Sequence, residues 1–245
     1  MKNNTVIGKL LILRNWKALP SIKWYDVRNL MGMFMPISKI YVKDVDSRWM
    51  SIKTSNREDF STYYSIWRRK DYHTEMLDFD VIFDFGANIG LASLYLSKQF
   101  PDSKIFAFEP DVETFKVLQE NITKRTNVRA YNQAIGIDSG ELDFYHSESG
   151  KTSGLLREYV NDFTNRISKV NVVSIKETLL PYINSNILIK LDIEGLEMEV
   201  LEEIEKLTFT KECHIVFEKD VNYDHEILTR FTLIKENDLI GYIKL

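Results

Sequence analysis

The sequence predicts an α/β protein built around a parallel sheet, and three observations support this. An apolar run, Val81–Phe85, leads into a glycine-containing turn and then into a helix-like apolar pattern over residues 91–96. From there onward strand-like and helix-like segments alternate, which favours parallel strands joined by right-handed crossovers. Acidic residues stand at or near the ends of three strands, at Asp84, Glu109 and Asp192. Polar groups should therefore gather at the carboxyl edge of the sheet, where α/β proteins bind ligands.

Length and composition indicate one large domain. A chain of 245 residues with 44% hydrophobic and 28% charged residues is ordinary for a globular protein, so disorder is not favoured. The single cysteine, Cys213, excludes a disulfide framework and indicates a reducing compartment. The histidines lack zinc-ligand spacing, no uncharged stretch is long enough to span a membrane, and the first twenty residues make a weak signal peptide. We therefore expect a cytoplasmic location.

The charge is unevenly distributed along the chain. Residues 1–75 carry 14 Lys and Arg against 7 Asp and Glu, whereas the remainder is acidic. We predict a basic N-terminal extension over residues 1–75 that packs on a core domain over residues 76–245. An apolar and basic mixture over residues 1–30 indicates an amphipathic helix on the body or on a membrane. Contact with an acceptor, peripheral contact with a membrane surface and a plain solvated face all remain open. We predict no nucleic-acid partner.

Two elements are expected ahead of the core. Residues 37–54 alternate apolar and polar side chains in places and predict one or two short strands. Residues 57–67 predict a helix, because aromatic residues recur there at helical spacing. These aromatic positions are Phe60, Tyr63, Tyr64 and Trp67. Such a stripe favours packing in the core over a substrate platform.

The turn after the first core strand contains two glycines, Gly86 and Gly90. They allow close approach of the backbone to a ligand, and the following helix supplies free N–H groups. The dinucleotide fingerprint would need glycine where Asn88 and Leu91 stand, so a pyrophosphate fits poorly. Asp84 instead suits a ligand with positive charge, such as S-adenosylmethionine, which has an ammonium group, a sulfonium and no phosphate.

The second core strand, Lys104–Phe108, is followed by Glu109. Glu109 stands nineteen positions after Gly90, near the spacing at which an acid binds ribose hydroxyls. An alternative is that Asp84 and Glu109 merely cap helices, and Pro110 would suit a first helical position. Two acids at adjacent strand ends favour the ligand site.

Further elements follow in order along the chain. We expect a helix over 112–122, then a strand and a following turn over 127–135, with the turn at 132–136. A strand over 141–145 should lead into a flexible loop over 149–154 that could cover a site. The remaining expected elements are a strand over 169–174, a short helix over 175–180, a strand over 212–217, a helix over about 224–234 and a final strand from 241.

Lys190 interrupts the apolar strand Asn186–Leu191. A lysine buried on a central strand needs an oppositely charged partner. Because side chains alternate between the two faces of a strand, Lys190 and Asp192 lie on the same face, and Glu194 joins them if the chain stays extended. An alternative is that Asp192 caps a helix starting near Gly195, which explains the acids but not the lysine.

Four segments carry a family resemblance: Phe83–Gly90, Phe106–Pro110, Ile189–Leu201 and, more weakly, Ile215–Glu218. In order and spacing the chain resembles the FkbM family of S-adenosylmethionine-dependent methyltransferases from about residue 56 to about residue 240. The resemblance implies a Rossmann-like class I methyltransferase fold, a three-layer α/β/α arrangement with a mostly parallel seven-strand sheet. The short C-terminus leaves open a sheet trimmed at that edge.

The resemblance also implies which residues form the site. The cofactor, S-adenosyl-L-methionine, would contact a loop made of Asp84, Gly86, Ala87, Asn88 and Gly90. Glu109 would bind the ribose hydroxyls, and Gln133 and Ala134 would lie near the adenine. The candidate catalytic residues are Lys190, Asp192 and Glu194, with either acid as base or acceptor anchor and the lysine orienting them.

The implied reaction is O-methylation of a sugar hydroxyl in a glycan, a lipopolysaccharide or a natural product. Two variants of the site remain open: a divalent metal held by Asp192 and Glu218, and His73 or His146 as the base. A histidine follows the acid at Glu218 in many members, and its absence here weakens a role for Glu218. A nicotinamide-dependent oxidoreductase, disfavoured by the missing glycines, and a non-catalytic S-adenosylmethionine-binding module are the alternative functions.

Overall fold

The computed structural model describes residues 31, 38–43, 49–74, 78–148, 152–219, 230–236 and 240–245. The chain forms two compact units, residues 1–61 and residues 62–245. The helix expected over residues 1–30 lies outside the described residues. The division at residue 75 that the charge pattern indicates stays a prediction.

The first unit contains a short antiparallel pair of strands. Strand β1 (Lys39–Lys43) pairs with β2 (Trp49–Lys53), and Ile40 lies opposite Ile52. Both isoleucines are fully buried, which explains the apolar and polar alternation of this segment. The two short strands expected here are confirmed.

The helix expected near residues 57–67 begins as α3 (Asp59–Tyr63) and continues as a π-helical segment, η3 (Tyr64–Arg69). Trp67 donates a hydrogen bond from Nε1 to the carbonyl oxygen of Leu91 at 3.2 Å. Its ring also packs edge-on against Tyr95, with the centroids 5.5 Å apart. The aromatic stripe thus packs against neighbouring elements, as predicted.

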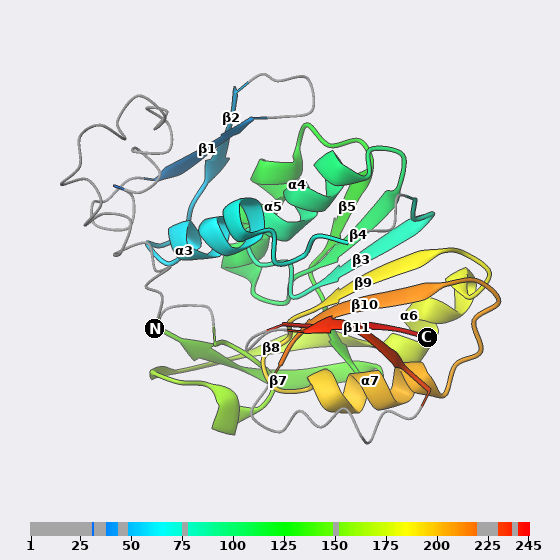
Figure 1. The fold of residues 1–245 in the computed structure, drawn as a ribbon. Helices are drawn as coiled ribbons and strands as arrows, with labels where there is room; N and C mark the ends of the chain where they lie inside the picture. Colours follow the sequence, from blue (N-terminus) through cyan, green and yellow to red (C-terminus); the bar gives the residue numbers. More distant parts are fainter. Residues whose placement is uncertain are drawn as a thin grey trace, which may run out of the picture. The chain divides into compact units, whose positions relative to one another are not determined.

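The second unit is built on a seven-stranded sheet (Figure 1). Its strand order is β11-β12-β10-β9-β3-β4-β5. The strands are β3 (Val81–Phe85), β4 (Lys104–Phe108), β5 (Val128–Tyr131), β9 (Ile187–Leu191), β10 (Cys213–Glu218), β11 (Thr232–Glu236) and β12 (Ile240–Lys244). Five neighbouring strands, β10-β9-β3-β4-β5, are parallel. The chain moves outward from β3 to β5 and returns to β9 on the other side of β3, so the point where the strand order reverses lies between β3 and β9.

The C-terminal edge of the sheet is complete. Strand β12 pairs antiparallel with both β10 and β11, and β11 is the edge strand. The sheet is therefore not trimmed at this edge, which the sequence had allowed. The helix expected over about 224–234 is wrong where the chain is described, because Thr232–Glu236 is a strand. Antiparallel pairing with the apolar strand β12 determines the structure of this segment, and local helical spacing does not.

Helices cover both faces of this sheet, giving the three layers expected (Figure 1). One face carries α4 (Leu91–Gln99) and α5 (Val112–Ile122), and the other carries α6 (Ile175–Leu179), η5 (Leu180–Tyr182) and α7 (Glu197–Glu205). Residues of α6 and α7 form one buried apolar cluster with alternate residues of β3, β9 and β10. Among the described residues no helix has the length and apolar character that a membrane crossing requires.

A separate three-stranded sheet follows β5. It consists of β6 (Ala134–Gly136), β7 (Gly140–Ser147) and β8 (Phe163–Ser174), in the order β6-β8-β7, with η4 (Arg157–Tyr159) between β7 and β8. The strand expected from residue 127 is confirmed as β5, whereas the turn expected at 132–136 is partly strand, because Ala134–Gly136 pairs with β8. The side chain of Asn132 donates to the carbonyl oxygens of Glu109 and Pro110 at 2.9 and 2.8 Å, which ends β5 and redirects the chain.

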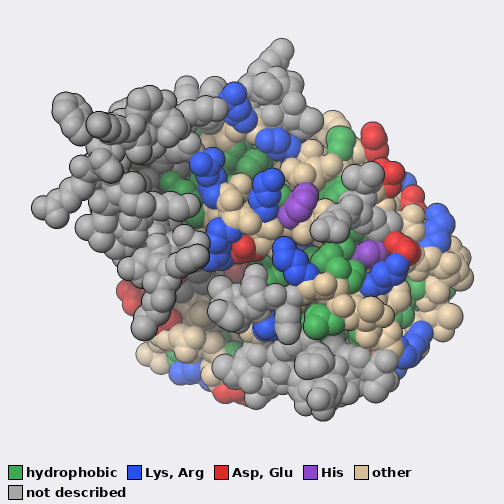
Figure 2. Space-filling view, viewed as in Figure 1, with side chains coloured by type: hydrophobic (Ala, Val, Ile, Leu, Met, Phe, Trp, Pro, Cys, Tyr) green, Lys and Arg blue, Asp and Glu red, His purple; other side chains and the backbone are tan. Residues whose placement is uncertain are grey.

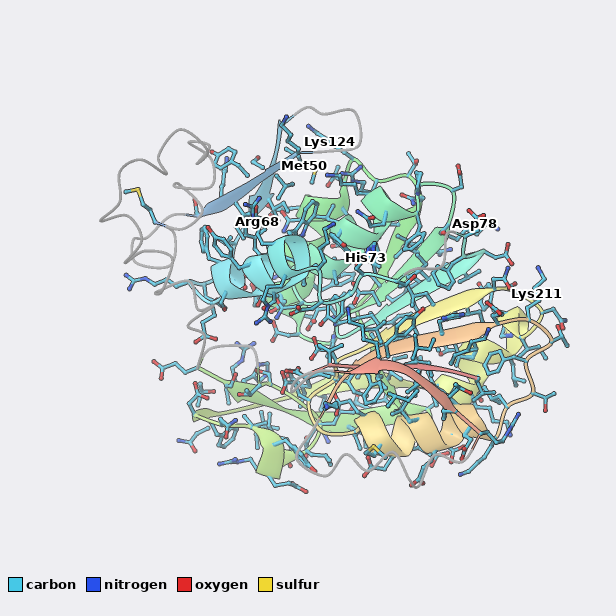
Figure 3. The ribbon with its side chains drawn as sticks, viewed as in Figure 1. Met50, Arg68, His73, Asp78, Lys124 and Lys211 are labelled. Carbon is cyan, nitrogen blue, oxygen red and sulfur yellow. The ribbon has the colours of Figure 1, made fainter. Side chains whose placement is uncertain are left out.

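Basic side chains gather around a His on the face seen in Figure 2. Within the predicted basic extension, the end of η3 contributes an exposed run of three, Arg68, Arg69 and Lys70. Arg69 pairs with Asp71 at 2.5 Å. Arg68 is labelled in Figure 3. The contact of this extension with an acceptor or a membrane surface stays a prediction.

Candidate active site

The turn between β3 and α4 has the backbone conformation that its glycines predict. Gly86, Asn88 and Gly90 have positive φ angles of 72°, 49° and 88°. A Cβ at Gly86 would lie 1.8 Å from the carbonyl oxygen of Asp192, so only glycine fits there. The N–H of Ala87 donates to the carbonyl oxygen of Phe108 at 2.8 Å. The turn thus joins the carboxyl ends of β3, β4 and β9.

Glu109 lies beside this turn, as predicted. Its Oε2 accepts a hydrogen bond from the N–H of Asn88 at 2.9 Å, and its Oε1 accepts one from the N–H of Asp111 at 2.9 Å. It is not a helix cap, because Asp111 caps α5 by accepting from the N–H of Thr114 at 2.8 Å. Burial raises the pKa of Glu109 to about 7, against the opposing effect of the two backbone N–H groups.

Gln133 and Ala134 lie between β5 and the start of β6. The Asn132 side chain ties this turn to the backbone of Glu109. The structure thus brings the predicted cofactor residues to one edge of the sheet. Their individual roles toward a cofactor stay predictions.

Asp84 is fully buried and is engaged on both carboxylate oxygens. Oδ2 accepts a hydrogen bond from Ser93 Oγ at 2.5 Å, and Oδ1 lies 3.3 Å from Lys190 Nζ. Helix α4 begins after Gly90 without a side-chain cap, so the alternative role of Asp84 as a helix cap is wrong. Its observed role is to hold Lys190, and a direct contact with a ligand stays a prediction.

Lys190 is 3% exposed and has four polar neighbours. Its Nζ lies 3.2 Å from Asp192 Oδ2 and donates to the carbonyl oxygens of Phe85 and Gly86 at 3.1 and 2.6 Å, in addition to the Asp84 contact. Burial by itself lowers the pKa of Lys190, but the carboxylates of Asp192 and Asp84 outweigh it and the net shift is upward. Lys190 is therefore a fixed cation, and it pairs with Asp192 as the strand alternation predicts.

Three carboxyl groups meet beside this lysine. Asp192, Glu194 and Glu218 each offer an oxygen within 4.8 Å of the others. Burial opposes ionisation of Asp192, but Lys190 and the hydrogen bond with Glu218 lower its pKa overall. Burial and the charge of Asp192 raise the pKa of Glu194 to about 9, and the charge of Asp192 with burial raises that of Glu218 to about 8. At neutral pH one ionised carboxylate thus stands beside two protonated ones.

Glu194 reaches this cluster by a turn and not by continued strand. Strand β9 ends at Leu191, and Glu194 and Gly195 have φ angles of 61° and 112°. Glu197 holds the turn by accepting from the N–H groups of Ile193 and Gly195 at 2.7 and 2.8 Å. Helix α7 starts at Glu197 without a side-chain cap, so the alternative in which Asp192 caps a helix near Gly195 is wrong.

The loop expected over residues 149–154 packs against this turn where it is described. A Cβ at Gly154 would lie 3.0 Å from the carbonyl oxygen of Glu194. A Cβ at Gly195 would lie 2.5 Å from Cγ of Tyr159, so the tyrosine ring lies directly on that glycine. Two described residues between β7 and β8, Gly154 and Tyr159, therefore pack against the turn that carries Glu194.

Sequence reasoning missed Tyr72 and underrated Glu218. Tyr72 is 7% exposed, donates a hydrogen bond from its hydroxyl to Asp192 Oδ2 at 3.3 Å, and has its ring 5.9 Å from Lys190 Nζ. Burial and the charge of Asp192 raise the pKa of Tyr72 well above its usual value, so it stays a donor. Nothing in the local sequence distinguishes this tyrosine, whereas Glu218 could be found as a third acid at a strand end.

The two histidines named as alternative bases lie elsewhere. His73 is exposed, just past the end of η3 (Figure 3). His146 is 6% exposed and its ring nitrogens contact Asp111 and Ser168. Among the described residues neither histidine forms a hydrogen bond or ion pair with Asp192, and their role as a base stays a prediction.

The opposite edge of the sheet offers a contrast. Asp80 accepts from the N–H of Asn186 at 2.8 Å and pairs with Lys211 at 3.2 Å. Both side chains are half-exposed, and Lys211 is labelled in Figure 3. This is an ordinary surface ion pair, whereas the pair of Lys190 and Asp192, at the same distance, is mostly closed off from water.

The chain was compared with known protein families, and one of them covers the residues of this site. A family model described as Methyltransferase FkbM domain matches residues 84–237, which include the glycine turn, Glu109 and the carboxyl cluster. The chain belongs to the FkbM methyltransferase family. The matched region begins at Asp84 in β3 and ends in the C-terminal hairpin of this FkbM protein.

Three relatives of this FkbM chain illustrate the similarity. The chain is 25% identical over 202 residues to the hexuronic acid methyltransferase AglP of Haloferax volcanii. This match covers 81% of this chain and 77% of that protein. It is 29% identical over 152 residues to Methyltransferase 1 of Beauveria bassiana (52% and 59% covered) and 28% identical over 156 residues to Methyltransferase sdnD of Sordaria araneosa (51% and 60% covered). The chain thus spans about three fifths of the length of the last two proteins.

Solved structures give more distant matches. A precorrin-6y C5,15-methyltransferase from Geobacter metallireducens is 12% identical, with a TM-score of 0.37 and 78% of this chain and 88% of that chain covered. A SAM dependent methyltransferase from Aquifex aeolicus is 12% identical, with a TM-score of 0.35 and 67% and 80% covered. The fold assignment of the FkbM chain therefore rests on its strand order and on the family match.

Proposed function

We propose that this FkbM protein transfers a methyl group from S-adenosyl-L-methionine to a hydroxyl group of a sugar. The observation that carries the proposal is one sheet edge at which a glycine turn, the strand-end acid Glu109 and the buried pair of Lys190 and Asp192 lie together. The edge is the one at which the strand order reverses, between β3 and β9, where α/β sheets bind ligands.

The residues at this edge fit the cofactor. Gly86 has no room for a side chain beside Asp192, and the positive φ angles of Gly86, Asn88 and Gly90 form a tight turn at the sheet edge, of the kind that lets backbone approach a ligand. Glu109 offers two carboxylate oxygens for ribose hydroxyls, as an acid in this position does in nucleotide-binding sheets. Asp192, the ionised member of the carboxyl cluster, suits a cationic ligand.

The chemistry assigned to this chain is positioning and proton removal. When bound, the cofactor supplies a methyl group on a positively charged sulfur. Asp192 is ionised and is held by Lys190 and Tyr72, so it is the group best placed to accept the proton of an acceptor hydroxyl. Asp192 would take the proton that the acceptor oxygen gives up when it receives the methyl group. Glu194 and Glu218 already hold protons at neutral pH and therefore serve as anchors for the acceptor.

A divalent metal is the second version of this site. Asp192, Glu194 and Glu218 would be its oxygen ligands, and it would acidify the acceptor hydroxyl. Lys190 already supplies the cation beside Asp192, which supports the metal-free version.

The acceptor class is inferred from a relative. AglP, a hexuronic acid methyltransferase, is similar to this chain over 202 residues. A sugar-containing acceptor, in a glycan or a small molecule, is consistent with a site that needs only one hydroxyl oriented by carboxyl groups. A cytoplasmic location stays a prediction from the cysteine content.

Calorimetry with S-adenosylhomocysteine and with NADH tests the cofactor. We expect binding of the first at micromolar concentration and no binding of the second. Binding of NADH alone would favour the oxidoreductase alternative and overturn the proposal. Transfer of labelled methyl from the cofactor to a panel of sugars and glycans tests the reaction, and cofactor binding with no transfer to any acceptor would favour a non-catalytic binding module.

A further inference from the structure

His146 connects the three-stranded sheet to the turn that carries Glu109. It lies on β7, and its Nε2 is 2.8 Å from Oγ of Ser168 on β8. Its Nδ1 is 3.1 Å from Oδ2 of Asp111, at the start of α5. Both ring nitrogens of this buried histidine are therefore engaged, one on each side.

Asp111 continues the connection toward the proposed cofactor site. Its Oδ1 caps α5 through the N–H of Thr114, and its own N–H donates to Oε1 of Glu109 at 2.9 Å. The other carboxylate oxygen of Glu109 accepts from the N–H of Asn88 in the glycine turn. A continuous series of polar contacts thus runs from Ser168 on β8 to Asn88 in the glycine turn, through His146, Asp111 and Glu109.

The same three side chains do not form a hydrolytic site. Ser, His and Asp occur here in the order of a nucleophilic triad. Ser168, however, lies on the face of β8 that also carries Val170 and Val172, and these valines pack in a buried cluster with Phe144. Burial and the nearby Arg166 lower the pKa of His146, so the ring is neutral at physiological pH. A neutral ring beside Asp111 carries its proton on Nδ1 and accepts from Ser168 on Nε2.

We propose that His146 is a positioning residue for the ribose end of the cofactor site. By holding the side chain of Asp111, it fixes the backbone N–H that orients the Glu109 carboxylate toward the glycine turn. This inference rests on the proposed function, because the carboxylate matters only if the ribose of the cofactor binds there. It requires no contact between the histidine and the cofactor.

Two substitutions of one residue separate the two contacts of the ring. In His146→Asn the amide nitrogen stands near the position of Nδ1 and retains the donor to Asp111, while the contact with Ser168 is lost. In His146→Gln the longer side chain reaches the position of Nε2 and retains Ser168, while Asp111 loses its partner. Calorimetric titration of S-adenosylhomocysteine into each full-length variant measures the result, with the melting temperature of the same samples recorded in parallel.

We expect the dissociation constant of His146→Asn to stay within about twofold of the unsubstituted protein, and that of His146→Gln to rise about tenfold, the effect of one misplaced hydrogen bond. A purely structural role would lower both melting temperatures and leave the two affinities alike, and that result would overturn the inference. Failure of the unsubstituted protein to bind S-adenosylhomocysteine would instead overturn the proposed function itself.

A measurement on the unsubstituted protein covers the case in which His146→Gln does not fold. In protein labelled with 15N at histidine, the Nδ1 resonance of His146 should shift when S-adenosylhomocysteine is added, because Glu109 and Asp111 are coupled to it. An Nδ1 resonance that stays unchanged at saturating S-adenosylhomocysteine would contradict the inference.

Discussion

Lys190 is the residue on which the charge balance of the site depends. It is the cation between two buried or half-buried carboxylates, Asp84 and Asp192, and it also binds two backbone carbonyl groups. Its removal would leave acidic groups in a low-dielectric environment without compensation. The residue that breaks the apolar pattern of β9 thus holds the ends of β3 and β9 together.

Lys190→Met should lower the free energy of unfolding by about 3–5 kcal/mol, the usual cost of removing one partner of a buried ion pair. Lys211→Met is the matched control, because Lys211 pairs with Asp80 at the same 3.2 Å on the surface. We expect the control to lose less than about 1 kcal/mol. Urea unfolding measures both, and equal small losses would contradict the account of the buried pair.

Asp192→Asn should reduce kcat for methyl transfer by about 100-fold or more, since it removes the proton acceptor. The dissociation constant of S-adenosylhomocysteine should change less than about threefold, whereas Glu109→Ala should raise it about tenfold or more. Asp80→Asn, at the opposite edge of the sheet, serves as control. Comparable losses of affinity in Asp192→Asn and Glu109→Ala would refute the division of roles.

The pKa of Glu109, raised by burial to about 7, predicts a pH dependence of binding. The ribose hydroxyls need the ionised carboxylate, so affinity for S-adenosylhomocysteine should fall as the pH decreases through about 7. In the free protein the same shift acts on stability in the opposite sense. The folded state binds the proton more tightly than the unfolded state, so about 3 kcal/mol of stability is lost between pH 4.5 and 7. Titration calorimetry between pH 4.5 and 7 should show a fall in affinity for S-adenosylhomocysteine that is absent in Glu109→Gln. The same fall in that variant would assign the pH dependence of binding to another group.

At the scale of elements, two turns bring the candidate catalytic side chains together. The turn after β3 contacts the carbonyl oxygen of Asp192, and the turn after β9 has two successive left-handed residues, Glu194 and Gly195. At Gly86 and Gly195 neighbouring atoms leave no room for a side chain. The strand ends therefore meet only because glycine stands at Gly86 and Gly195.

Gly86→Ala should lower the free energy of unfolding by about 3 kcal/mol or more, since the new Cβ would lie 1.8 Å from the Asp192 carbonyl oxygen at a φ of 72°. Gly140→Ala is the control, because no atom stands within 4 Å of its Cβ position. That change should alter stability by less than about 1 kcal/mol. Equal effects of the two substitutions in chemical denaturation would contradict the close approach.

The elements that the sequence predicts best are those with a local signal. The apolar strands β3 and β9 and the glycine turn follow from short patterns. The segment after β5 does not, because Asn132 bends the chain through bonds to the distant backbone of Glu109 and Pro110. The C-terminal strand β11 was missed for a similar reason, since its strand form depends on pairing with β12.

At the scale of the whole molecule, the order of motifs along the chain predicts the seven-strand sheet and its family. The site residues Lys190 and Asp192 follow from alternation along a strand, and their 3.2 Å contact agrees with that expectation. Tyr72 could not be predicted, because it comes from a segment ahead of the sheet and meets Asp192 across 120 positions of sequence. Contacts of that kind depend on tertiary packing and leave no local pattern.

The most direct test is a crystal structure of the full chain with S-adenosylhomocysteine. The account predicts the ribose hydroxyls within hydrogen-bond distance of Glu109, the methionine portion against the Gly86–Gly90 turn, and the sulfur facing the carboxyl cluster at Asp192. Nucleoside bound at another part of the protein, with Glu109 free of it, would contradict the central claim.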